Sequence, residues 1–122
     1  MDKLDEIFKK QAELDAFMSE KRSYAKHYTK EDWVQKKCLA LMDELGELID
    51  EVNYKWWKNP KPLNKTAISE ELVDILHFWT SICIDMDLSA SDIHAVYLKK
   101  NQENKDRQTG KIKKEGYNVS EK

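Results

Sequence analysis

Two short acidic motifs constrain this chain more than any other feature. The motifs are D-E-L-G-E at residues 43–47 and E-E-L-V-D at residues 70–74. Each contains two carboxylates three residues apart, a spacing that places both side chains on one face of an α-helix. The second motif leads into a strongly apolar stretch, where carboxylates are costly to desolvate unless a positive charge compensates them. Because carboxylate oxygens suit hard divalent cations, the two motifs predict a metal site between two helices.

The composition limits the class of protein. The chain has 122 residues, so we expect a single domain over residues 1–122 with a modest core. Charged residues make up 36 % but nearly balance, and the formal net charge of −2 argues against a nucleic-acid binder. No apolar run approaches the roughly 20 residues of a membrane span, and the charged N-terminus does not resemble a signal peptide. We therefore expect a cytoplasmic protein with no membrane partner, whose two cysteines, Cys38 and Cys83, are buried thiols.

Apolar residues recur at three- and four-residue steps in four segments, which predicts an all-α fold, a bundle of four to five helices. We expect helices over about residues 2–20, from 29 to between 52 and 57, over 64–86 and over 90–106. Capping boxes are predicted at residues 29–32 and 89–92, and Ile93, Val96 and Tyr97 are predicted to face inward. The third segment is apolar around most of its circumference, so we expect it to be central and to need a homodimer to cover it. The polar tail, about residues 107–122, is expected to be mobile without ligand.

A basic and amide-rich face follows on the fourth predicted helix. Asn101, Asn104 and Arg107 are spaced by three residues, and Lys100 lies four residues before Asn104, so the four side chains are expected to share that face. Mg²⁺ usually shares its coordination shell with substrate phosphates, and Lys100 and Arg107 would neutralise the phosphate charge that the metal does not reach. This combination favours hydrolysis of a phosphoanhydride, in which one carboxylate orients or deprotonates a water molecule. No P-loop or glycine-rich cradle is present.

Two other interpretations stay open. A ferritin-like di-iron bundle needs E-x-x-H on two helices, and here only Asp74-x-x-His77 approximates that pattern. Pairs of the E-x-x-E type are also common on solvated helix faces. The chain could then be a non-catalytic helical dimer that acts as a binding or regulatory module.

The divided acidic motif resembles that of the all-α NTP pyrophosphohydrolases, which include the MazG-type enzymes and the dimeric dUTPases. Further segments resemble the dimeric dUTPase branch. They are Gln11-x-x-Leu14-Asp15, Lys55-Trp56-Trp57, Asp74-x-x-His77-Phe78, Lys100-Asn101-x-x-Asn104-x-x-Arg107-Gln108 and Gly116-Tyr117. The chain departs from the branch in its short length, in Asp15 where some members have Asn, and in residues 109–115, which resemble an insertion.

The resemblance implies a Mg²⁺-dependent homodimer that splits dUTP into dUMP and pyrophosphate and so removes dUTP from the nucleotide pool. It implies two or more Mg²⁺ ions per site, replaceable by Mn²⁺. The implied metal ligands and catalytic residues are Glu44, Glu47, Glu71 and Asp74, with Glu47 positioning the attacking water. The implied substrate-binding residues are Gln11, Asp15, Lys55, Trp56, His77, Phe78, Lys100, Asn101, Asn104, Arg107 and Tyr117. Hydrolysis of another nucleotide such as dCTP, in a MazG-like housecleaning role, stays an alternative, and the sequence identifies no protein regulator.

Overall fold

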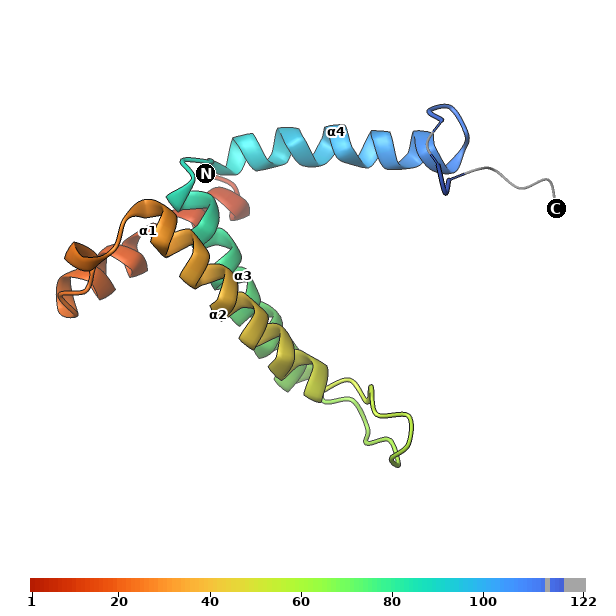
Figure 1. The fold of residues 1–122 in the computed structure, drawn as a ribbon, viewed down its shortest axis with the longest axis horizontal. Coiled ribbons are helices and arrows are strands. Elements are labelled where there is room, and N and C mark those ends of the chain that lie inside the picture. Colours follow the sequence, from red (N-terminus) through yellow and green to blue (C-terminus); the bar gives the residue numbers. More distant parts are fainter. Residues whose placement is uncertain (114, 118–122) are drawn as a thin grey trace. The chain divides into compact units, whose positions relative to one another are not determined.

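The computed structural model describes residues 1–113 and 115–117, and the regular structure within them is entirely helical. The elements are α1 (Lys3–Lys21), the 3₁₀ turn η1 (Ala25–His27), α2 (Lys30–Asp50), α3 (Lys65–Asp85) and α4 (Ala90–Gln108) (Figure 1). The predicted all-α class is therefore confirmed, with four α-helices. Among the described residues, no helix has the length and apolarity that a membrane crossing requires.

Two helices begin at the capping boxes that the sequence predicts. The Thr29 hydroxyl accepts a hydrogen bond from the Asp32 amide at 3.1 Å, and the Asp32 carboxylate accepts one from the Thr29 amide at 3.0 Å. Ser89 and Asp92 make the same reciprocal pair at 3.1 and 2.9 Å. Because each box satisfies backbone donors that a helix start leaves unpaired, these residues fix where α2 and α4 begin.

The end of α2 differs from the prediction. The helix ends at Asp50, whereas the apolar pattern predicts an end between residues 52 and 57. Asn53 adopts a left-handed backbone with φ 53°, a conformation that Asn tolerates better than most residues. Its side-chain amide donates to the Lys61 carbonyl at 2.7 Å and accepts from the Lys61 amide at 2.9 Å. These two bonds close the connection to α3 on itself, which the helical periodicity could not reveal.

The chain divides into two compact units, Met1–Leu88 and Ser89–Lys122. In the first unit, α2 and α3 form an antiparallel pair and α1 also packs on α3 (Figure 1). The prediction that the third helix is central is therefore confirmed within this unit. The second unit contains α4 and the turn that follows it, where the amides of Lys111 and Ile112 both donate to the Asp106 carbonyl. A single domain over residues 1–122 stays a prediction.

The tail is partly helical. Since α4 continues through Gln108, residues 107 and 108 belong to a regular element. The sequence also predicts a mobile segment at residues 114 and 118–122, but these residues lie outside the described ones. The mobility of the tail stays a prediction.

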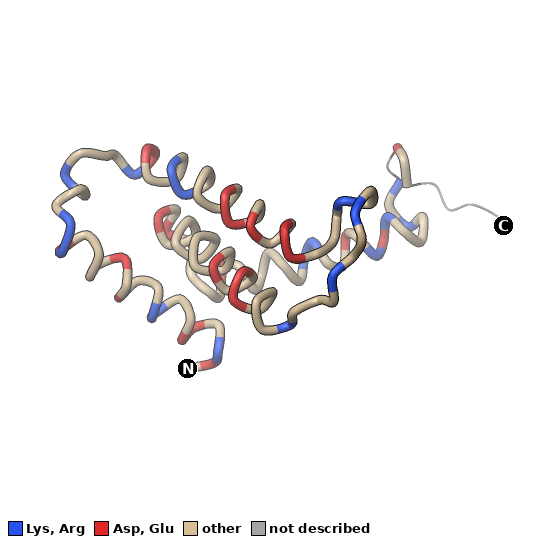
Figure 2. The backbone as a smooth tube through the Cα atoms, turned by 90° about the horizontal axis from the view of Figure 1, so that it is seen from below, with Lys and Arg blue, Asp and Glu red and all other residues tan. Residues whose placement is uncertain are grey.

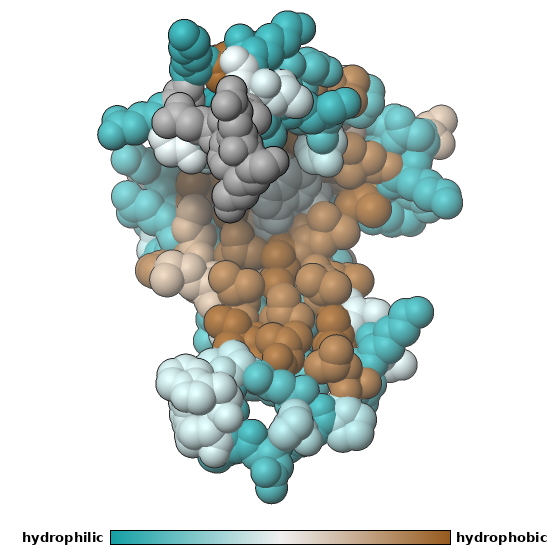
Figure 3. Space-filling view, turned by 90° about the vertical axis from the view of Figure 1, so that its right-hand side faces the viewer, coloured by the Kyte–Doolittle hydropathy of each residue, from teal (hydrophilic) through white to brown (hydrophobic). Residues whose placement is uncertain are grey.

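Few side chains of a single chain are buried. The buried apolar residues are Phe8, Cys83 and Ala90, and the buried polar residues are Gln11, Thr80 and Ser81. Cys83 is buried as predicted, but Cys38 is exposed, and so are Val96 and Tyr97, so those three predictions are wrong for the single chain. Apolar side chains gather instead over a broad area of the surface (Figure 3).

Candidate metal and nucleotide site

Four carboxylates meet between α2 and α3. Glu44 and Glu47 come from α2, and Glu71 and Asp74 come from α3. One carboxylate oxygen of each lies within 4.8 Å of those of the other three. Acidic residues mark the facing stretches of both helices (Figure 2). The i, i+3 spacing turns each pair toward the opposite helix, so the structure brings together the four residues that the sequence singled out. We call this group the acid cluster.

The acid cluster carries negative charge that no ion pair among the described residues compensates. The Oε2 atoms of Glu44 and Glu71 are buried and have no hydrogen-bond partner. No Lys or Arg among the described residues forms an ion pair with any of the four carboxylates. Burial raises the pKa of Glu44 above its ordinary value of 4.5, and the nearby charges of Glu47 and Asp74 raise it further. Burial also raises the pKa of Glu71, and its interaction with Glu47 adds to the effect.

A divalent cation fits this donor set. Carboxylate oxygens are the ligands that Mg²⁺ prefers, and a cation would supply the missing partner for both buried Oε2 atoms. It would also offset the repulsion that raises the pKa of both glutamates. The arrangement therefore meets the chemical requirements of a metal centre.

A chain of three hydrogen bonds joins α1 to α3 beyond the acid cluster. His77, three residues after Asp74, has its Nδ1 atom 2.6 Å from the Gln11 Oε1 atom. The Gln11 Nε2 donates to the Asp15 Oδ1 at 2.9 Å, and the Ser81 hydroxyl donates to the Asp15 Oδ2 at 2.7 Å. The structure thus brings together Gln11, Asp15 and His77, which the resemblance assigned to substrate. Ser81 was missed, although it follows His77 by one helical turn on the same face of α3.

A cavity of about 370 Å³ adjoins this chain of hydrogen bonds. Its lining residues come from α1, from the segment between α1 and α2, from α2 and from α3. They are Gln11, Leu14, Asp15, Met18, Tyr24, Trp33, Lys36, Lys37, Ala40, His77, Phe78 and Ser81. Ala40 lies one turn before Glu44 on α2, and Phe78 lies one turn after Asp74 on α3, so the cavity is adjacent to the acid cluster along both helices. We call it the inner cavity, and its volume is typical of sites for small molecules.

The sequence prediction missed the aromatic wall of the inner cavity. The ring centroid of Trp33 lies 5.1 Å from the ring centroids of both Tyr24 and Tyr28. Lys37, one turn further along α2, forms an ion pair with Asp85 at 2.6 Å. A signal was present, since Trp33 and Lys37 share one face of a helix that begins at a capping box.

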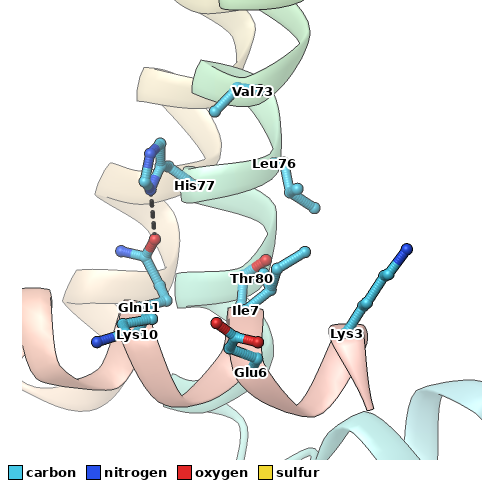
Figure 4. A pocket seen from close by; sticks show the side chains of 9 residues that line it. All are labelled: Lys3, Glu6, Ile7, Lys10, Gln11, Val73, Leu76, His77 and Thr80. Carbon is cyan, nitrogen blue, oxygen red and sulfur yellow. Dashed lines mark hydrogen bonds between the residues drawn. The ribbon is translucent and has the colours of Figure 1, made fainter.

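A second, larger cavity shares Gln11 and His77 with the first. Its volume is about 460 Å³, and Figure 4 shows its lining. Ile7, Val73 and Leu76 make it mainly apolar, while Lys3, Glu6 and Lys10 surround it. None of the four acids lines either cavity. We place the candidate nucleotide site in the inner cavity, despite the larger volume here, because it alone of the two also contains Asp15 and Phe78, which the resemblance assigns to substrate.

Lys55 and Trp56 lie in the connection after α2. The Trp56 side chain is 86 % exposed and contacts the Trp57 ring at a centroid distance of 4.7 Å. In the single chain Trp56 therefore does not anchor a core. Lys55 lines a separate cavity of about 350 Å³ within the same connection. No contact described for the chain links either residue to the acid cluster.

The remaining predicted residues belong to the second unit. Lys100 and Asn101 are exposed on α4. The Arg107 guanidinium donates to the Asn104 Oδ1 at 3.3 Å and lies 6.0 Å from the centroid of the Tyr117 ring. These contacts bring Asn104, Arg107 and Tyr117 together, and no described ion pair joins Arg107 to Glu103 or Asp106. Their contact with a nucleotide stays a prediction.

Comparison with known proteins identifies the family. A family model described as dUTPase matches residues 3–92, which contain all four acids and the residues of the inner cavity. The match ends before Lys100, so the basic face of α4 lies outside it. The chain is also 35 % identical over 74 residues to the uncharacterized protein YpjD of Bacillus subtilis (strain 168), covering 58 % of this chain and 67 % of that protein.

No solved structure matches the chain. The family match spans well over half of the 122 residues, and the matched part folds into the helices that carry the acid cluster. The chain therefore belongs to the dUTPase family, an all-α family of the MazG-like superfamily, and is a nucleoside triphosphate pyrophosphohydrolase.

Proposed function

We propose that this protein is a Mg²⁺-dependent dUTP pyrophosphohydrolase, which converts dUTP and water to dUMP and pyrophosphate and so removes dUTP from the nucleotide pool. The acid cluster beside the inner cavity carries the proposal. Two of its oxygens are buried without a partner, and the cavity begins one helical turn away. A nucleoside in the cavity would direct its phosphates toward the acids.

In this proposal Glu44, Glu47, Glu71 and Asp74 hold two or more Mg²⁺ ions, which Mn²⁺ can replace. When bound, the cations polarise phosphoryl oxygens and lower the pKa of a coordinated water. Glu47 is exposed, whereas Glu44 and Glu71 are half-buried. From this exposed position on α2, Glu47 would orient the attacking water from the solvent side and accept its proton.

The inner cavity would take the base and the deoxyribose. Gln11 and His77 offer polar groups in its wall, and the rings of Trp33 and Phe78 offer apolar contact area. Asp15 supports this wall from α1 through the Gln11 amide. The exposed Trp56 ring and the Lys55 ammonium group are available to cover a bound nucleotide from the connection after α2.

The second unit would supply cations for the phosphates. Lys100, Asn101, Asn104 and Arg107 share one face of α4, and Tyr117 lies beside the Arg107 guanidinium. A guanidinium offers a planar pair of donors that suits phosphate oxygens.

We also propose that the working form is a homodimer. Leu39 and Met42 on α2 are each 67 % exposed, and Ile49 lies on the same face. Leu72 and Val73 on α3 are also about half exposed. A second copy that covers these side chains would remove a large apolar area from water.

Product analysis tests the proposed function. The purified protein is incubated with Mg²⁺ and each of a panel of deoxynucleoside and ribonucleoside triphosphates, and the products are separated by ion-exchange chromatography. We expect dUMP and pyrophosphate in equal amounts, with dUTP the preferred substrate. Preference for dCTP would select the housecleaning alternative. Binding of a non-hydrolysable dUTP analogue without any turnover would select the non-catalytic module, since a ligand of the folded state raises Tm by mass action.

A further inference from the structure

We propose that Asp15 is a positioning residue that fixes the protonation of His77 through Gln11. In this proposal the His77 imidazole carries a proton on Nδ1, and the neutral ring presents Nε2 to a ligand as a hydrogen-bond acceptor. The ligand in question is the nucleotide of the proposed function, but the argument about His77 rests on protein contacts alone.

The contacts run in one line from α1 to α3. Asp15 uses both of its carboxylate oxygens inside the protein, Oδ1 for the Gln11 amide and Oδ2 for the Ser81 hydroxyl. Gln11 uses its amide nitrogen for Asp15 and its amide oxygen for His77. Gln11 therefore links the Asp15 carboxylate to the His77 ring.

The Asp15 carboxylate determines which group donates and which accepts in each of these hydrogen bonds. A carboxylate only accepts hydrogen bonds, so the Gln11 group that faces Asp15 has to be the NH₂ and not the carbonyl. The opposite amide orientation would place two oxygens about 2.9 Å apart in a part-buried environment, which is strongly unfavourable. The charge of Asp15 thus decides which end of the Gln11 amide points to His77.

The orientation of Gln11 then decides the tautomer of His77. The Gln11 carbonyl oxygen can only accept, so His77 has to donate from Nδ1 across the 2.6 Å contact. In the neutral ring the second nitrogen, Nε2, then has a free lone pair. Figure 4 shows the ring standing on the Gln11 amide, with its other edge turned away from it.

The two partners of the Asp15 carboxylate, Gln11 and Ser81, are buried, so water does not readily replace them. Gln11 is 6 % exposed and Ser81 is 2 % exposed, so an amide released by Asp15 would lose a hydrogen bond that solvent cannot restore. No Lys or Arg among the described residues forms an ion pair with Asp15. The donors that hold the carboxylate are therefore Gln11 and Ser81.

A bare Nε2 atom in the wall of the inner cavity selects a ligand that donates. In a deoxyuridine nucleotide the donor is either the imide N–H of the base or the 3′ hydroxyl of the sugar. Cytosine has a lone pair where uracil has its imide N–H, so cytosine would place an acceptor against an acceptor. A ligand with an acceptor at this position loses the hydrogen bond to Nε2 and is bound less tightly.

The test reads the tautomer directly. Imidazole ¹⁵N–¹H spectra are recorded at about pH 8, where an ordinary histidine is neutral. The chain has three histidines, and a His77→Gln variant assigns the His77 signals. We expect His77 to show the Nδ1–H pattern, whereas free histidine favours Nε2–H. Predominance of Nε2–H at His77 in the wild type would overturn the proposal, whether or not the protein hydrolyses dUTP.

Three variants separate positioning from general structure. Asp15→Leu removes the acceptor and should convert His77 toward Nε2–H. Asp15→Asn keeps a carbonyl for Gln11 and an NH₂ for the Ser81 hydroxyl, so it should retain Nδ1–H. Glu13→Leu removes an exposed acid from the same helix and should change nothing. Persistence of Nδ1–H in folded Asp15→Leu would overturn the proposal, and if that variant does not fold, Gln11→Met takes its place with the same expectation.

Kinetics then identify the donor on the ligand. In Asp15→Leu we expect KM for dUTP to rise roughly tenfold with a smaller change in kcat, the size of one lost hydrogen bond. Asp15→Asn should stay within about twofold of the wild type, because its tautomer is retained. If the rise in KM persists with the 3′-deoxy analogue of dUTP, the donor is the base N–H, and if it disappears, the donor is the sugar hydroxyl. A rise in KM in Asp15→Asn equal to that in Asp15→Leu would show that Asp15 does not act through His77.

Discussion

Glu44 on α2 and Glu71 on α3 face each other across the helix pair, and each has a buried Oε2 atom that accepts no hydrogen bond. Folding brings their ligand oxygens, with those of two further acids, within 4.8 Å of one another. Without a cation this proximity is unfavourable, and it contributes to the raised pKa of both glutamates. The same proximity is what a divalent cation requires, because its charge turns mutual repulsion into shared coordination.

The first prediction concerns stability and pH without divalent cations. Both glutamates have a raised pKa in the folded state, so the folded state binds their protons more tightly than the unfolded state does. Their stabilising contribution is complete below the ordinary value of 4.5 and is lost as pH rises through the raised pKa. In chemical denaturation at several pH values, Glu71→Gln should lose less stability over this range than the wild type. Parallel curves for the two proteins would contradict the prediction.

Added Mg²⁺ provides the control for this prediction. Metal ligands have to be deprotonated, so the rise in Tm on adding Mg²⁺ should grow as pH increases over the same range. Glu71→Gln should show a much smaller rise. A rise in Tm that is the same at every pH would show that the stabilising cation does not bind at the acid cluster.

The second prediction concerns catalysis by Glu47. Glu47→Gln retains the shape of an exposed side chain but removes the negative charge, so the protein should fold normally and lose at least about a hundredfold in kcat. Asp43→Asn is the matched control, since it neutralises an exposed acid in the same motif outside the cluster. Steady-state hydrolysis of dUTP measures both, and full activity in folded Glu47→Gln would contradict the catalytic role.

The third prediction concerns assembly. Light scattering at micromolar concentration should give twice the chain mass of 14.4 kDa. Met42→Glu places a charge on the exposed apolar face of α2, so it should shift the equilibrium to the monomer while α2 stays helical. Gln35→Glu adds a charge to an exposed polar position of the same helix and should leave the dimer intact. A wild-type protein that is uniformly monomeric would refute the homodimer.

The fourth prediction concerns Arg107. If its guanidinium binds phosphate, Arg107→Ala should lower kcat/KM for dUTP and dCTP by similar factors of about ten- to a hundredfold, the range expected for a charge-assisted contact. Base preference and Tm should change little, because Arg107 forms no described ion pair. Lys105→Ala, an exposed cation in the same turn of α4, serves as the control. Unaltered kinetics on both nucleotides would show that this face does not contact substrate.

Local chemistry explains what the sequence could predict. The capping boxes at Thr29 and Ser89 depend on residues three positions apart, and both are present. The acid cluster needs only two i, i+3 pairs on helices that pack side by side, which the apolar pattern already implies. These features depend on short distances along the chain and on one helix–helix contact.

The remaining features depend on tertiary placement. Ser81 meets Asp15 only because α1 packs on α3 at one particular register. The spacing from His77 to Ser81 indicates a shared face of α3, but it does not indicate the partner on α1. The exposure of Cys38 and Tyr97 follows from the lack of a covering element in the single chain, although both sit in apolar patterns. The helix α2 ends earlier than predicted because the Asn53 side chain forms hydrogen bonds with the Lys61 backbone, eight residues later.

The equal division of the four acids between α2 and α3 has a mechanical consequence. A cation coordinated by both pairs would link α2 to α3. The two helices could then separate only when the ion is released. Amide hydrogens around Glu44 and Asp74 should then exchange with solvent more slowly when Mg²⁺ is bound, whereas those at the start of α1 should not respond. Filling the site would set the mobility of the hairpin, and the wall of the inner cavity that α2 and α3 provide would become rigid before a nucleotide arrives.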